Sequence, residues 1–186
     1  MANVGLTTFL HSELSDEAVP KYKAEAKKLM GAISVKVDIE LNDAKLYADD
    51  VLQESDNSFV SGKITLEGDK DEPEIFAPIL GKTIGEDGEV ISKTTDEPIF
   101  VGFAYITRQS GKGSSVKKYR AKFYPKVQFK DFETEAKTQE DKMEYVKPSV
   151  EGTIYPLPDG TWKKENNFST LQEAVTYLKS CFATTP

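Results

Sequence analysis

The chain has 186 residues, a net charge of -7, one cysteine and one histidine. A single cysteine excludes an intramolecular disulfide framework, and a single histidine excludes every site that needs two imidazoles. No apolar run approaches the roughly 18 residues of a membrane span, and the N-terminus lacks the order of a signal peptide. We therefore expect one domain over residues 1–186, made in a reducing compartment, with no membrane partner, and large enough to bury roughly 70% of its unfolded surface.

The N-terminal region predicts little regular structure. Residues 4–10 fit a short strand, but residues 12–28 are polar and charged without a sustained period. A second short strand is predicted near residues 26–30, before Gly31 turns the chain. We expect residues 1–30 to form an N-terminal arm.

Two long alternating runs are the feature around which the chain is organised. Residues 32–41 and 60–67 place apolar and polar side chains at alternate positions, the period of a strand with one face toward a core. The expected core-facing residues are Ile33, Val35, Val37, Ile39 and Leu41 in the first run and Val60, Ile64 and Leu66 in the second. Between the runs, the acidic residues 47–58 are predicted to form a long loop, a kind of segment that is often functional.

The middle of the chain predicts a short helix, a hairpin and a central strand. Acidic residues and Pro73 begin an apolar helical stripe that Gly81 ends. The Asp87-Gly88 pair marks a hairpin turn. Residues 99–106 are apolar on both faces, as in a strand buried on both sides. The core members expected from this strand are Phe100, Phe103, Tyr105 and Ile106.

Residues 116–130 predict a strand with one apolar and one basic face. The apolar face holds Tyr119, Ala121, Phe123, Val127 and Phe129, and the basic face holds Lys118, Arg120, Lys122, Lys126 and Lys130. Cations at every second residue lie roughly 6.8 Å apart, a spacing that suits a phosphate backbone. The net negative charge of the chain argues against such binding, because it repels nucleic acid.

The C-terminal part predicts further strands and a final helix. A polar strand is expected near residues 132–138 and another over residues 143–155, with a turn at residues 158–160. Ser169 and Gln172 match a capping box, after which apolar residues recur at helical spacing.

Strands dominate this pattern and alternate with turns rather than with helices. The expected fold class is mostly β, with two packed antiparallel sheets in a β-sandwich, a short flanking helix and a C-terminal helix. Residues 164–186 are expected to form a C-terminal helical extension of the domain.

Charge is strongly segregated along the chain. Residues 38–97 hold 17 acidic residues against 5 lysines, a net charge of -12, and residues 108–130 hold 8 basic residues and no acid, a net charge of +8. One interpretation is that these are solvated faces of neighbouring strands that cancel within the monomer. The other is that the acidic region of one copy meets the basic region of another, which encodes head-to-tail association.

Catalytic and metal chemistry finds little support in the sequence. Cys181 lies among apolar neighbours on the predicted helix, where a packed thiol is a better interpretation than a nucleophile. Residues 111–114 lack the upstream glycine of a phosphate loop, and neither Asp49-Asp50 nor residues 69–74 fit the calcium-loop pattern. We expect no enzymatic activity, no metal site and no cofactor.

Several short motifs resemble one family. The most specific is Leu46-Tyr47-Ala48-Asp49-Asp50, which follows an alternating strand. The others are Gly5-Leu6, the segment from Leu29 to Ser34, the segment from Glu151 to Ile154, and Asp159-Gly160 with Trp162. Together, over residues 4–163, they resemble the major tail proteins, or tail tube proteins, of long-tailed bacteriophages of the phi13-like type.

The resemblance implies a β-sandwich whose copies form hexameric rings, stacked into a non-contractile tube through which DNA passes without specific binding. It also implies partners in the tape measure, tail terminator and tail tip proteins, and a place in the virion tail after assembly in the host cytoplasm. The long loop of such proteins contacts the adjacent ring, so the candidate contact residues are Tyr47, Asp49, Asp50, Val51, Leu52, Glu54 and Asp56. The complementary basic face would be Lys118, Arg120, Lys122, Lys126 and Lys130. The C-terminal helix does not match the family pattern and would be a local addition on the tube exterior.

Two other classes of function remain open at this point. A monomeric β-sandwich that binds carbohydrate or protein would be a stable monomer with clustered exposed aromatic residues. A nucleic-acid-binding or acidic-protein-binding chain would use the basic strand over residues 116–130, and its binding would be sensitive to salt.

Overall fold

Strands make up most of the computed structural model of this chain. The described residues are 2–18, 20–48, 51–56, 58–70, 72–110, 118–132 and 147–183, with the backbone alone described for 2, 44–48 and 51–56. The strands are β1 (Ala2–Asp16), β2 (Lys21–Tyr22), β3 (Lys27–Lys28), β4 (Ala32–Leu41), β5 (Ala44–Ala48), β6 (Val51–Asp56), β7 (Phe59–Gly68), β8 (Thr83–Ile84), β9 (Val90–Ile91), β10 (Phe100–Ser110), β11 (Lys118–Phe129), β12 (Ser149–Ile154) and β13 (Lys164–Phe168). The helices are α1 (Pro73–Ile79) and α2 (Leu171–Phe182).

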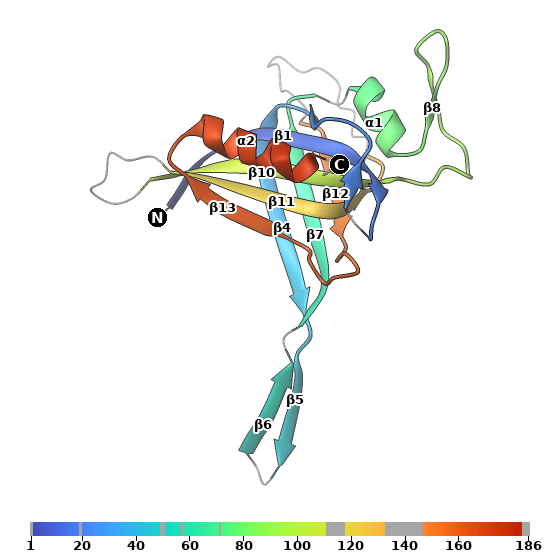
Figure 1. The fold of residues 1–186 in the computed structure, drawn as a ribbon. Coiled ribbons are helices and arrows are strands. Elements are labelled where there is room, and N and C mark those ends of the chain that lie inside the picture. Colours follow the sequence, from blue (N-terminus) through green and yellow to red (C-terminus); the bar gives the residue numbers. More distant parts are fainter. Residues whose placement is uncertain are drawn as a thin grey trace, which may run out of the picture.

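Nine strands form one antiparallel hydrogen-bonded sheet in the order β2-β1-β10-β11-β12-β7-β4, with β3 beside β1 and β13 beside β11. In Figure 1, β4 and β7 run steeply across β1, β10 and β11, so the sheet folds over through β12 into two layers. The helix α2 lies against the layer that contains β10 and β11. The mostly β class predicted from the sequence, with antiparallel layers and two helices, is confirmed.

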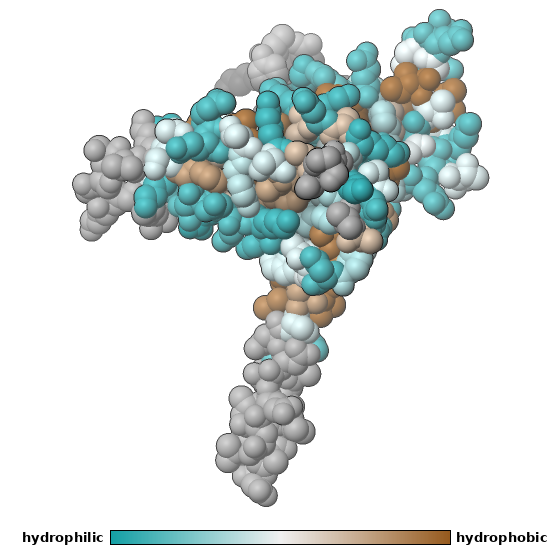
Figure 2. Space-filling model, viewed as in Figure 1, coloured by the Kyte–Doolittle hydropathy of each residue, from teal (hydrophilic) through white to brown (hydrophobic). Residues whose placement is uncertain are grey.

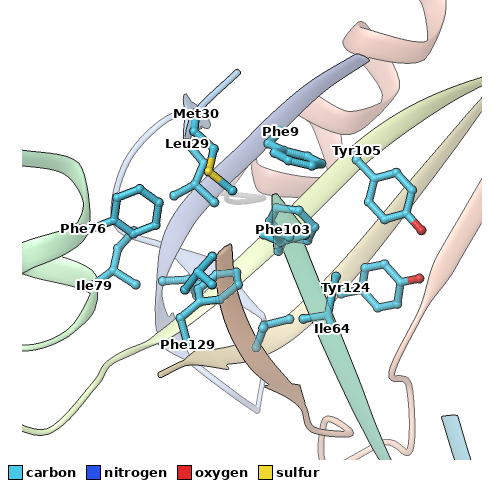
Figure 3. Packing of buried hydrophobic residues seen from close by; sticks show 14 of the residues in the cluster. Phe9, Leu29, Met30, Ile64, Phe76, Ile79, Phe103, Tyr105, Tyr124 and Phe129 are labelled. Atoms are coloured by element: carbon cyan, nitrogen blue, oxygen red, sulfur yellow. The ribbon is translucent and has the colours of Figure 1, made fainter. Parts of the chain in front are cut away.

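The strand β10 is the centre of the fold because it supplies side chains to two apolar clusters. Phe103 lies between the layers, with its ring centroid 5.5 Å from that of Phe9 and 5.8 Å from that of Phe129 (Figure 3). On the opposite face of β10, Ala104 and Ile106 pack in the cluster beneath α2. The prediction of a strand buried on both faces is therefore confirmed.

The N-terminal segment is not an arm. β1 pairs with β10 from Ala2 opposite Ser110 to Glu13 opposite Val101, so it lies inside the large sheet. Its polar end is also held, because the Ser12 hydroxyl donates a hydrogen bond of 2.7 Å to the carbonyl of Ala24. The sequence of this segment did not show the pairing because the partners of Ser12 and Glu13, Gly102 and Val101, lie far along the chain.

The segment predicted to be a long acidic loop contains a β-hairpin. Lys45 pairs with Ser55 and Ala48 with Val51, and positions 49 and 50 between them lie outside the described residues. The hairpin continues β4 and β7 away from the body, as Figure 1 shows at the lower end of the molecule. A two-stranded ribbon with no core-facing side need not alternate apolar and polar residues, so the usual strand signal is missing.

The C-terminal region is part of the body and not an extension. β13 pairs with β11 from Phe168 opposite Tyr119 to Lys164 opposite Phe123, and Leu178 of α2 is fully buried in the cluster beneath the helix. The capping box predicted at Ser169 and Gln172 is wrong by one position, because Thr170 and Glu173 form it. Most of the polar strand predicted over residues 132–138 lies outside the described part of the chain.

The packing around Phe103 generates a stability prediction. Replacing Phe103, which is fully buried, with alanine should lower the free energy of unfolding by about 3–5 kcal/mol, because a cavity remains between the two layers. Phe100→Ala on the same strand is the control: Phe100 is only half-buried at the rim, contrary to the core position predicted for it, and should cost less. Chemical denaturation measures both, and a loss under about 1 kcal/mol for Phe103→Ala would contradict the central position of β10.

Two glycines with positive φ test how the segment before β10 is attached. Gly81 (φ 72°) ends α1 and Gly88 (φ 80°) lies in the turn between β8 and β9, and an added Cβ would meet the carbonyl oxygen of Glu97 only at Gly81. Gly88→Ala should cost about 1 kcal/mol from backbone strain alone. Gly81→Ala should cost at least about 1 kcal/mol more, because the Glu97 backbone must move. If thermal unfolding shows equal losses of stability for the two variants, the Glu97 backbone moves away from the added Cβ at no measurable cost.

Candidate assembly surfaces

The first candidate surface is the projecting β5–β6 hairpin. It carries the contact residues predicted from the sequence: Tyr47 lies opposite Leu52, Val51 opposite Ala48, Glu54 opposite Leu46, and Asp56 opposite Ala44. Asp49 and Asp50 lie outside the described residues. The structure thus brings the described members together on one two-stranded element away from the body, although as a hairpin and not as a loop.

Where this hairpin leaves the body, three apolar side chains face water, and we call Ile39, Leu41 and Val60 the junction patch. Leu41 is 51% exposed and Val60 is 53% exposed, so the core positions predicted for them are wrong. Ile33, at the other end of β4, is also exposed. Figure 2 shows apolar surface gathered at the junction with the hairpin. The alternating period continues past the point where the other layer ends, and period alone cannot show that end.

An aromatic stack lies beside the junction patch. The rings of Phe59 and Trp162 are parallel, with centroids 4.5 Å apart and planes 9° apart, and both are only partly buried against the main core. The ammonium of Lys163 lies 5.1 Å from the centroid of the Trp162 ring. Apolar surface thus extends from the core to the base of the hairpin.

The strand β4 also ends the sheet order. Among the strands that the structure describes, β4 pairs only with β7, so its other edge presents backbone donors and acceptors along ten residues. An edge of this length is a template for pairing with another chain unless charge or a bulge protects it. Lys36 and Asp38 pair with each other at 2.8 Å and provide charge there, but the junction patch at the end of the strand is apolar.

The basic face predicted for β11 is divided between two sides of the sheet. Lys122 lies over the ring of Tyr105, on the side of the main core, whereas Lys126 lies 4.3 Å from the centroid of Phe100, on the side of α2. Lys126 is also paired with Glu17 at 2.7 Å, and Lys130 follows the end of the strand. The prediction of five cations on one face is therefore wrong, because an extra residue in β11 reverses the alternation of side chains.

The cations that do share a side are Lys118, Arg120 and Lys122 of β11, and with Lys163 they form what we call the basic face. Burial lowers the pKa of the Lys122 ammonium, and Lys163 and Arg120 lower it further, while Glu165 across the strand pair raises it. Arg120 donates a hydrogen bond of 3.0 Å to the neutral amide of Asn167. Among the residues that the structure describes, Glu165, which pairs with Lys163 at 3.3 Å, thus faces four cations, and this leaves the described surface positive.

A second projecting hairpin, β8–β9, was predicted from its turn, but no contact surface was predicted on it. Residues 82–98 leave the body after α1 and return before β10, and we call them the arm. Ile84, Val90 and Ile91 are each 37% or 38% exposed on it. Apolar residues on both sides of the Asp87-Gly88 turn were the sequence signal for this surface.

The lone histidine, His11, is buried, and the lone cysteine, Cys181, is half-buried. Burial, with the charge of Lys27 second, lowers the pKa of His11 to about 4, although a hydrogen bond to the Lys27 backbone opposes it. Burial raises the pKa of the Cys181 thiol, which keeps it protonated and weakly nucleophilic at neutral pH. Among the described residues, no group of three or more His, Cys, Asp or Glu side chains is placed to hold a metal ion.

No helix in the described ranges is long and apolar enough to cross a membrane. Comparison with known proteins found no protein-family model that matches the chain. A search of curated proteins likewise returned no match.

The environment of His11 generates a pH prediction. Its pKa is about 4 in the folded chain and about 6.5 when unfolded, so between these values the unfolded chain binds more protons. Stability contributed by neutral His11 is present above pH 6.5 and is lost as the pH falls toward 4, up to roughly 3 kcal/mol. His11→Leu should remove this dependence. If denaturation midpoints of the two proteins shift in parallel from pH 7 to pH 4, His11 is not held neutral by the fold.

Proposed function

We propose that the chain is a structural subunit that assembles with copies of itself into stacked hexameric rings, forming the tail tube of a bacteriophage virion. The observation that carries this proposal is the β5–β6 hairpin, which projects from a complete body and has the junction patch exposed at its base. The motifs that resemble tail tube proteins include Leu46-Tyr47-Ala48, which lies on this hairpin. The mostly β fold agrees with the same family.

The junction patch gives a physical reason for association. Contiguous apolar surface rimmed by polar residues marks an interaction site more often than scattered apolar residues do. Burying the exposed parts of Leu41 and Val60 against another copy contributes about 25 cal/mol for each Å² removed from water. This gain must exceed the cost of ordering two partners, so neighbouring contacts from the hairpin and the β4 edge are needed as well.

The charge distribution supports the conduit role. Residues 38–97 carry a net charge of -12, and the chain as a whole carries -7. DNA passes a wall of this sign without binding, because each phosphate contact with lysine or arginine would add salt-dependent affinity. The basic face would then lie against a neighbouring subunit or on the exterior, and the tape measure, tail terminator and tail tip proteins would be the other partners.

The junction patch supplies the test. Val60→Lys should leave a folded monomer with a nearly unchanged melting temperature that no longer forms tubes or rings, because a lysine cannot be buried there without a partner. Val4→Lys is the matched control: Val4 is 58% exposed and, like Val60, lies at a register shift in a strand. Electron microscopy of the concentrated proteins compares the three.

A second variant addresses Asp49 and Asp50, which join β5 to β6 in the sequence. Reversing both to lysine should also prevent stacking, because repulsion would replace attraction between copies, and circular dichroism checks that the fold is kept. Wild-type protein that remains monomeric under all conditions would contradict the proposal and favour a monomeric binding module. Normal tubes from Val60→Lys would remove the junction patch from the stacking contact.

A further inference from the structure

The arm is attached firmly at its base, but few interactions within the arm stabilise its own structure. At its base the Ile99 amide donates a hydrogen bond of 3.0 Å to the Ile79 carbonyl, and Gly81 packs against the Glu97 backbone. Beyond this base, β8 and β9 form only the pairs Thr83 with Ile91 and Ile84 with Val90. A two-stranded hairpin alone is marginally stable in water, so the arm needs a surface against which to pack.

The arm offers apolar side chains and acidic groups together. Ile84, Val90 and Ile91 are exposed on the two strands, and Figure 2 shows apolar surface on this projecting part of the molecule. Three of the four tip residues are acidic, in the order Glu86-Asp87-Gly88-Glu89. A partner must therefore combine contact for branched apolar side chains with positive charge.

Two other surfaces on a second copy do not fit this tip. The junction patch lies among Asp38 and Glu40, which would repel it. The hollow of about 480 Å³ at the base of the arm is lined by acidic residues, among them Glu13, Asp96 and Glu97. Like charges brought together at an interface cost several kcal/mol, so both surfaces are excluded as partners.

The basic face has the required charge, because among the described residues Glu165, which pairs with Lys163 at 3.3 Å, is set against four cations. Lys118 is exposed, and Arg120 and Lys122 follow it at alternate positions on the same side of β11, so three cations lie in a row there. The aliphatic stem of the half-buried Lys122, which covers the buried ring of Tyr105, provides apolar contact. An approaching carboxylate would relieve repulsion among these cations.

We propose that the arm of one copy binds the basic face of β11 and β13 on a second copy of this chain. The inference rests on the proposed self-assembly but uses a surface separate from the β5–β6 hairpin. Because two different patches meet, the contact is heterologous and continues from copy to copy, closing into a ring when the rotation allows.

Charge reversal on each side tests the pairing. Glu86→Lys with Glu89→Lys keeps the Asp87-Gly88 turn and reverses the arm, and Lys118→Glu with Arg120→Glu reverses the basic face. Each double variant should associate at least tenfold more weakly than wild type in sedimentation velocity. An equal mixture of the two should regain the wild-type mass, because each reversed arm then meets a reversed face.

The control variant changes the net charge by the same amount, but at positions outside the arm and the basic face. Lys21→Glu with Lys28→Glu reverses two exposed cations on β2 and β3, and should associate as wild type does. Unchanged association of the arm variant, or failure of the mixture to recover, would overturn the proposal. Circular dichroism of every variant checks that the fold is intact.

Cross-linking gives an independent measurement on the unaltered protein. A carbodiimide joins a carboxylate to an amine only when the two are in contact. In a mixture of ¹⁵N-labelled and unlabelled chains, the reagent should link the arm carboxylates to Lys118 or Lys122. A link between two copies is recognised because one of the two joined peptides is ¹⁵N-labelled and the other is not. Absence of such mixed links in associated protein would contradict the arm contact.

The outcome is separable from that of the proposed function. If the wild type associates through arm and basic face without forming tubes, the tube proposal fails and this inference stands. If tubes form and the arm variants form them equally well, the inference fails and the tube proposal stands. A wild-type protein that stays monomeric overturns both.

Discussion

The fold depends on a bulge in β11 at Pro125. A proline inside a central strand removes a ladder hydrogen bond, but here one edge of β11 is shared: residues 119–123 pair with β13 and residues 127–129 with β12, and Pro125 lies between the two. The bulge places Tyr124 and Val127, three positions apart, on the side of the main core, whereas Phe123 packs in the cluster beneath α2. The Tyr22 hydroxyl donates a hydrogen bond of 2.9 Å to the Pro125 carbonyl, which fixes the site.

The same division explains which surfaces remain open. β12 leads from one half of β11 into the second layer, which buries Val127 and Phe129 between the layers. The other half of β11 is followed by β13, the last strand on that side, so Lys118 and Arg120 lie beyond the second layer. The body is thus complete as a core, while its two hairpins project from it and the basic face lies at its surface.

Local patterns predicted the elements whose determinants lie close together in sequence. The period of residues 32–41, the apolar run at 99–106 and the spacing of the final helix each identified an element. Two determinants are not local: β1 is defined by pairing with β10, and the sides taken by Lys122 and Lys126 are set by the bulge at Pro125. The junction patch was missed for the same reason, because alternation does not show where the opposing layer stops.

The pairing of β1 with β10 bears on synthesis of the chain. The first residues of β1 lie opposite positions 105–110, and β11 is needed beyond them. At about 5–20 residues per second, the ribosome needs roughly 5–20 s to make the intervening chain. Only the second half of β1 has local partners during that time, in β2 and β3. β1 therefore completes its pairing only after β10 has been made, and nascent chains expose Phe9 until that partner strand emerges.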